Sequence, residues 1–140
     1  MLIFRISFVT AAMALIGTCV APQNGRTARL EGTNWKLVEM DGLPVATPSE
    51  RPFVLSFGHD GQVRGQVCSR LGGQYHVERQ QLIVGPVAMT EISCGELFDR
   101  LESRFLQIFS RPVAYHFAQD RSLLLGDPNR PVVRLLPTIQ

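Results

Sequence analysis

Beyond the first thirty residues, the chain alternates short apolar stretches with turn residues, a pattern typical of β-strands joined by tight connections. Phe53, Leu55 and Phe57 occupy every second position and therefore share one face of a strand. Gly72 and Gly73 predict a turn or bulge at a strand boundary. About eight strands with short links predict a mainly β fold, either a curved antiparallel sheet or an open barrel. The predicted strands are residues 35–40, 53–57, 62–67, 74–78, 82–84, 113–118, 122–125 and 132–136, with 87–89 extending the sheet.

One stretch, between residues 93 and 110, follows a helical period instead. Ser93 and Glu96 fit a capping box, which satisfies backbone N–H groups at a helix start, and Pro112 stops the helix soon after its end. Acidic and basic side chains are mixed on the polar face, so we expect this amphipathic helix to pack against the sheet and not to lie on a membrane. Its apolar side chains fall within roughly a third of the circumference: Cys94, Leu97, Phe98, Leu101, Phe105, Ile108 and Phe109.

Length and composition indicate one ordinary globular domain. The chain has 140 residues, 45% of them hydrophobic, which favours a packed core over disorder. Lys and Arg number 14 against 12 Asp and Glu, and a net charge of +2 gives no field that would favour nucleic acid. We therefore expect no binding to nucleic acid. We also expect a monomer, with the large apolar surface of the single Trp35 as a core anchor.

The N-terminus has the plan of a bacterial signal peptide. Arg5 precedes an uncharged apolar stretch, residues 6–17, which is shorter than the about 20 residues needed to span a bilayer. Residues 15–19, LIGTC, resemble a lipobox, the pattern in which the cysteine becomes the lipid-modified first residue of the mature chain. Thr18 departs from that pattern, which usually has Gly, Ala or Ser there.

The lipobox predicts how the chain is organised. Residues 1–18 are the predicted signal peptide, Cys19 the predicted site of lipidation, 19–29 a linker and 30–140 the folded domain. The alternative is ordinary cleavage after Ala21, which would remove Cys19 together with the signal peptide.

The other two cysteines, Cys68 and Cys94, leave several interpretations open. In an oxidising compartment a disulfide between them is the favoured hypothesis, and buried free thiols are the main alternative. A nucleophilic Cys94 with His59 or His76 as base, or a metal site from both cysteines and a histidine, lacks any recognised spacing. Because the phosphate-loop, catalytic-serine and metalloprotease motifs are also missing from the sequence, we predict no active site and no cofactor.

Four stretches resemble, in order and spacing, the motifs of one family. They are GTNWKL at 32–37, FGHDGQVRG at 57–65, CSRLGGQY at 68–75 and TEISC at 90–94. These are similar to the patterns G-T-x-W-x-L, F-x-x-D-G-x-V-x-G, C-N-x-x-x-G-x-Y and T-x-M-A-C of the META domain family, which includes HslJ-like envelope lipoproteins. The resemblance covers about residues 30–136. It departs from the family at Ser69, where Asn is usual. Asn tolerates a left-handed backbone, so the turn geometry that the family has at this position is in question here.

The resemblance implies a small β-rich barrel with one packed helix, and an outer-membrane lipoprotein connected with stress or drug tolerance. We expect a non-enzymatic protein that faces the periplasm, is held to the membrane through Cys19, and binds an unknown envelope protein or an apolar ligand. A secreted inhibitor of a cell-wall hydrolase is the alternative, and it would need a protruding loop such as Ser69, Arg70 and Leu71. An enzyme that uses a cysteine is a third hypothesis.

Overall fold

The structure, a computed structural model, describes residues 29–48 and 51–138, which form ten strands and one helix. The helix, α1 (Glu96–Ile108), follows the seventh strand. The strands are β1 (Thr33–Met40), β2 (Leu43–Pro44), β3 (Val54–Phe57), β4 (Gln62–Gln66), β5 (Arg70–Glu78), β6 (Gln81–Val84), β7 (Ala88–Met89), β8 (Val113–Phe117), β9 (Leu123–Asp127) and β10 (Arg130–Pro137).

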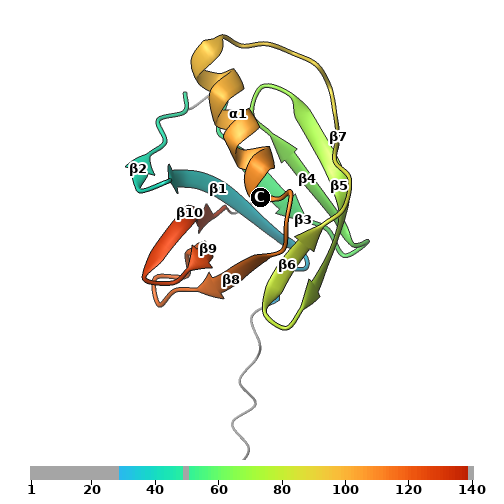
Figure 1. Cartoon of the computed structure of the whole chain (residues 1–140), viewed down its shortest axis with the longest axis vertical. Coiled ribbons are helices and arrows are strands. Elements are labelled where there is room, and N and C mark those ends of the chain that lie inside the picture. Colours follow the sequence, from blue (N-terminus) through green and yellow to red (C-terminus); the bar gives the residue numbers. More distant parts are fainter. Residues whose placement is uncertain (1–28, 49–50, 139–140) are drawn as a thin grey trace, which may run out of the picture.

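Eight of these strands form a closed antiparallel barrel (Figure 1). Strands β1, β3, β4, β5, β6, β8, β9 and β10 pair in this order, and β10 returns to pair with β1. The short strands β2 and β7 lie outside this ring and pair with β1 and β5. The predicted mainly β meander with one packed helix is confirmed, and the β10–β1 pairing closes it into a barrel.

An irregularity in β1 keeps its apolar side chains inside the barrel. Leu37 pairs with Leu135, and Glu39 pairs with the next residue of β10, Arg134, so β1 contains one extra residue at this point. A bulge of this kind reverses which side chains point inward beyond it. Met40 is consequently buried in place of Glu39.

The interpretation of Gly72 and Gly73 as a boundary turn is wrong. Both glycines lie inside β5, where they pair with Arg64 and Val63 of β4. A Cβ atom on Gly73 would come within 3.1 Å of the carbonyl oxygen of Pro86. The glycine therefore serves a close approach between β5 and the connection that leads to β7.

Helix α1 contributes the aromatic centre of the core. Phe105 is 0% exposed, and its ring centroid lies 4.4 Å from that of Phe53 and 4.8 Å from that of Phe109. In Figure 1 the helix lies between β1 and β2 on one side and β4 and β7 on the other. Among the described residues, no helix is both long and apolar enough to cross a membrane.

Two predictions about the start of α1 are wrong. Leu97, expected on the buried face, is 67% exposed, because the first turn of the helix projects beyond the barrel (Figure 1). The capping box does not form either. Gly95, at φ 102°, is the N-cap residue, and the carboxylate of Asp99 turns back to accept from the Ser93 hydroxyl (2.7 Å) and the Cys94 N–H (3.2 Å).

Glu102 lies on the buried side of α1 although it is charged. It is 4% exposed, and its Oε1 atom has no hydrogen-bond partner among the described residues. A buried polar atom without a partner costs about 1–3 kcal/mol. We expect Glu102→Leu to raise the free energy of unfolding by about that amount in urea titrations at neutral pH. The matched change Glu96→Leu, in the exposed first turn, should stay within about 0.5 kcal/mol of the wild type. A large loss of stability in Glu102→Leu would contradict the prediction.

The turn between β8 and β9 holds a carboxylate whose titration can be followed. Asp120 Oδ1 accepts a hydrogen bond from the Ser122 hydroxyl (2.6 Å) and one from the Ser122 backbone N–H (3.0 Å). Arg134 forms an ion pair with Asp120 Oδ2. These partners lower the pKa of Asp120 from 3.8 to about 2.

The lowered pKa of Asp120 predicts an acid-sensitive contribution to stability. Since the pKa is lower in the folded protein than in the unfolded chain, the contribution is fully present above about pH 4 and is lost as the pH falls to about 2. The urea midpoint of Asp120→Asn should therefore fall less steeply over this interval than that of the wild type. Equal slopes for the two proteins would contradict this assignment.

Candidate functional site

The first motif, GTNWKL, builds the beginning of the barrel. Trp35 Nε1 donates to Thr33 Oγ1 (2.7 Å), and this hydroxyl donates in turn to the carbonyl oxygen of Leu30. These bonds hold the loop that carries the Leu30 side chain into the core, where it is 2% exposed. Gly32 has φ 74°, and a Cβ atom there would lie 2.4 Å from the His59 ring. The motif glycine thus allows the β3–β4 turn to approach this loop.

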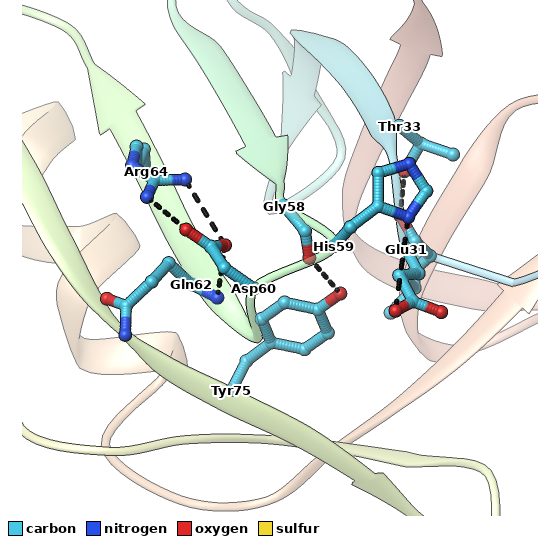
Figure 2. A network of polar contacts seen from close by, with 9 residues as sticks. Glu31, Thr33, Gly58, His59, Asp60, Gln62, Arg64 and Tyr75 are labelled. Carbon is cyan, nitrogen blue, oxygen red and sulfur yellow. Dashed lines mark hydrogen bonds and ion pairs between the residues drawn. The ribbon is translucent and has the colours of Figure 1, made fainter.

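The second and third motifs meet at the β3–β4 turn, shown in Figure 2. Asp60 Oδ1 accepts from the backbone N–H of Gln62 (3.0 Å), and Asp60 Oδ2 lies 2.5 Å from Arg64 Nη2. Both hydrogen bonds lower the pKa of Asp60, and the bond from Arg64 has the larger effect. The hydroxyl of Tyr75 on β5 donates to the carbonyl oxygen of Gly58 (3.1 Å), so the turn is fixed from both sides.

Beside this turn lies a hollow of about 410 Å³, which we call the tyrosine hollow. Its walls are mostly apolar, and Val77 is 42% exposed there. Burial is the main cause that raises the pKa of Tyr75, and the negative charges of Glu31 and Asp60 raise it further. The phenol is therefore neutral at physiological pH. An apolar surface with a neutral hydroxyl and a mixed-charge rim suits an apolar ligand. The hollow is lined by Arg29, Leu30, Glu31, Gly61, Tyr75, Val77 and Tyr115.

The tyrosine hollow was not among the sites predicted from the sequence. Tyr75 could have been suspected, because it ends one of the family-like motifs. Tyr115 belongs to β8, forty residues further along the chain, and nothing in the local pattern links it to Leu30. Barrel closure brings these side chains to one place.

The predicted disulfide between Cys68 and Cys94 is present, with the two Cα atoms 5.9 Å apart. Both sulfur atoms are therefore committed to a bond, and the structure does not contain the nucleophilic Cys94 of the alternative interpretation. Neither His59 nor His76 lines the hollows beside the disulfide. Within residues 29–48 and 51–138, no three His, Cys, Asp or Glu side chains are placed to hold a metal ion.

The proposed inhibitory loop at Ser69, Arg70 and Leu71 is wrong. Ser69 is 0% exposed and donates its hydroxyl to the carbonyl oxygen of Ile92 (3.3 Å), and Leu71 is 6% exposed. Arg70 is exposed, but it begins β5 and exchanges hydrogen bonds with Thr90, so its backbone is paired and the segment does not form a protruding loop. Ser69 also lies outside the left-handed region, so this site does not need the asparagine that the family has there.

The remaining predicted site residue, Cys19, lies outside the described residues, as do the signal peptide and most of the linker.

Comparison with known proteins agrees with the order of the motifs. A family model for the META domain matches residues 28–138. The chain belongs to the META domain family. Comparison with curated proteins gives no match. Two solved structures share the fold of this META domain, and both similarities, at 20% identity or less, concern the fold alone.

The first of these is described only as an NMR structure of the protein. It has a TM-score of 0.63 and 20% identity, over 74% of this chain and 87% of its own. The second is an NMR structure of a protein from Burkholderia xenovorans. It has a TM-score of 0.61 and 19% identity, over 96% of this chain and all of its own.

The contacts explain why the META motifs contain these residue types. Thr33 and Trp35 fix the loop at the start of the barrel, and Asp60 and Tyr75 fix the β3–β4 turn. Cys68 and Cys94, from the last two motifs, join the β4–β5 connection to the segment before α1. These motif side chains thus stabilise the META domain, and one of them, Tyr75, also lines the tyrosine hollow.

Proposed function

We propose that this META-domain protein is a non-enzymatic lipoprotein of the cell envelope that binds an apolar ligand in the tyrosine hollow. In this proposal, lipid on Cys19 anchors the chain to the outer membrane, and the barrel faces the periplasm as a monomer. Binding of an apolar ligand would suit the stress- or drug-tolerance role that the HslJ-like members suggest.

The observation that carries the proposal is the composition of the tyrosine hollow. Its volume of about 410 Å³ falls in the range of small-molecule sites, roughly 300–1,000 Å³. Leu30, Tyr75, Val77 and Tyr115 offer apolar and aromatic surface, while the rim carries one residue of each charge and therefore does not favour a charged ligand. The hollow also adjoins Arg29, at the end of the predicted linker. A lipid-anchored chain would therefore carry it near the membrane, where apolar molecules concentrate.

The anchor can be tested by measuring the intact mass of the protein extracted from membranes. Loss of the first 18 residues together with the mass of acyl chains on Cys19 is the expected result. An unmodified soluble chain would contradict the lipoprotein assignment without affecting the proposal for the hollow.

Ligand binding can be tested with 1-dodecanol, an uncharged apolar molecule, as the probe and Trp35 as the reporter. The ring of Trp35 lies 5.9 Å from Phe117, whose ring lies 5.9 Å from Tyr115 in the wall of the hollow. We expect a saturable fluorescence change, and at least about tenfold weaker binding in Val77→Glu, because a carboxylate there would face the apolar ligand.

Leu43→Glu is the matched control for this experiment. Leu43 is 69% exposed on β2 and does not line the tyrosine hollow, so its variant should bind like the wild type. Absence of a saturable change in the wild type, or the same loss in both variants, would contradict the proposed site.

The hydrolase-inhibitor alternative has lost the feature on which it depended. It needs a protruding loop, and in the loop suggested for this role, Ser69, Arg70 and Leu71, the side chains of Ser69 and Leu71 are buried. We therefore do not retain it as a second proposed function.

A further inference from the structure

The Cys68–Cys94 disulfide lies at the surface of the domain. Both cysteines are partly exposed, and both line two neighbouring hollows of about 470 and 330 Å³. We call these the disulfide hollows. An external thiol can therefore reach the disulfide while the barrel remains folded. The described residues that line them besides the cysteines are Pro48, Arg51, Pro52, Val54, Gln66, Val67, Ile92 and Phe98.

The two sulfur atoms differ in their electrostatic surroundings. Arg51 Nη1 lies 4.0 Å from Cys94 Sγ, and Arg51 is the only charged residue among the described residues lining either disulfide hollow. The Asp99 carboxylate, which accepts from the Cys94 N–H and the Ser93 hydroxyl, opposes the effect of that charge, but of these two side chains it is the Arg51 guanidinium that contacts the sulfur atom itself. A thiolate on Cys94 would thus be stabilised by the guanidinium, which makes Cys94 the better leaving group.

We infer that the Cys68–Cys94 disulfide is a thiol–disulfide exchange site for a dithiol reductant, at which Cys68 is attacked and Cys94 leaves. The attacking thiolate forms a bond to Cys68 Sγ, and the electron pair of the broken S–S bond stays on Cys94 Sγ beside Arg51. The second thiol of the reductant then loses its proton and attacks the first reductant sulfur, which is bonded to Cys68 in the mixed disulfide. This attack expels the Cys68 thiolate. Two electrons and two protons pass to the cysteines, and the dithiol becomes a disulfide.

Reduction would weaken the attachment of the segment before α1 without opening the barrel. The pairings that close the barrel include neither cysteine. Arg70 and Thr90 still exchange backbone and side-chain hydrogen bonds, and Ser69 still donates to Ile92. The segment before α1 would therefore remain attached by non-covalent contacts alone, so the redox state would set how firmly this end of the helix is held.

The first test measures how fast dithiothreitol reduces the full chain carrying Cys19→Ala, which leaves two cysteines. Reduction is followed by trapping free thiols with a maleimide at intervals. We expect a rate proportional to dithiothreitol concentration, and a roughly three- to tenfold slower rate in Arg51→Gln. Arg130→Gln, an exposed arginine that lines neither disulfide hollow, should match the parent chain.

The second test identifies the sulfur that is attacked. A brief reaction with glutathione is quenched with N-ethylmaleimide, and the peptides are mapped by mass spectrometry. Glutathione on Cys68 and the maleimide on Cys94 are expected. Glutathione on Cys94, an unchanged rate in Arg51→Gln, or a rate that saturates at the global unfolding rate would each overturn the inference.

Discussion

Replacing Phe105 by alanine is expected to lower the free energy of unfolding by about 3–5 kcal/mol, which is typical of a fully buried aromatic side chain. Phe105 is 0% exposed and makes edge-to-face contacts with Phe53 and Phe109, so its removal leaves a cavity between the helix and the barrel. Small domains are stable by only about 5–15 kcal/mol, and the variant should therefore be close to unfolding at moderate temperature. Urea titration followed by circular dichroism measures the difference.

Leu97→Ala is the matched control for the change at Phe105. Leu97 lies on the same helix but is 67% exposed, so its truncation should change the free energy of unfolding by less than about 0.5 kcal/mol. A loss of less than about 1 kcal/mol in Phe105→Ala would mean that α1 does not carry the centre of the core.

Removal of the disulfide by the double change Cys68→Ser and Cys94→Ser should have an effect of similar size. The two cysteines are separated by 26 residues. Opening a loop of that length costs about 3.5 kcal/mol in the chain-entropy model, because the unfolded chain gains conformational freedom. The free energy of unfolding in urea is the quantity to measure, with and without dithiothreitol.

The comparison with reductant supplies the control. Dithiothreitol should bring the wild type to about the stability of the double variant and should leave the double variant unchanged. Because the closing β10–β1 pairing does not involve either cysteine, the reduced wild type and the double variant should both still fold. A wild type that is as stable reduced as oxidised would show that the crosslink has no role in stability.

The tyrosine hollow and the disulfide hollows lie in different parts of the barrel. The tyrosine hollow lies where β1 begins, next to Arg29 and the β3–β4 turn. The disulfide hollows lie where β4 ends and α1 begins, beside Arg51. The ligand experiment and the exchange experiment therefore test separate surfaces, and failure of one would leave the other standing.

Local patterns predicted most of the elements because each depends on neighbouring residues. The alternation of Phe53, Leu55 and Phe57 predicted both the strand and its buried face, and all three side chains are at most 1% exposed. The neighbouring strands at 74–78 and 82–84 were also predicted, and between them Arg79 and Gln80 adopt the positive φ values that a tight hairpin turn requires.

The errors arose where a distant segment decides the local geometry. The sequence predicts a turn or bulge at Gly73 because its neighbours along the chain do not reveal Pro86, whose carbonyl oxygen would lie within 3.1 Å of a Cβ atom there. Leu97 fits the apolar helical arc, but the barrel ends before that turn of α1. Ser93 does not cap the helix, because Gly95, at φ 102°, is the N-cap residue. The Ser93 hydroxyl donates to the Asp99 carboxylate instead.

The amino-acid sequence was sufficient to predict the fold class, the amphipathic helix, the family motifs and the favoured pairing of Cys68 with Cys94, because periodicity, turn residues and cysteine number are local or countable properties. The tertiary structure alone decided that the meander closes through β10 and β1, that Leu30, Tyr75 and Tyr115 share one hollow, and that Arg51 lies beside Cys94. These contacts join segments far apart in the chain, and their positions depend on how all eight barrel strands align with one another.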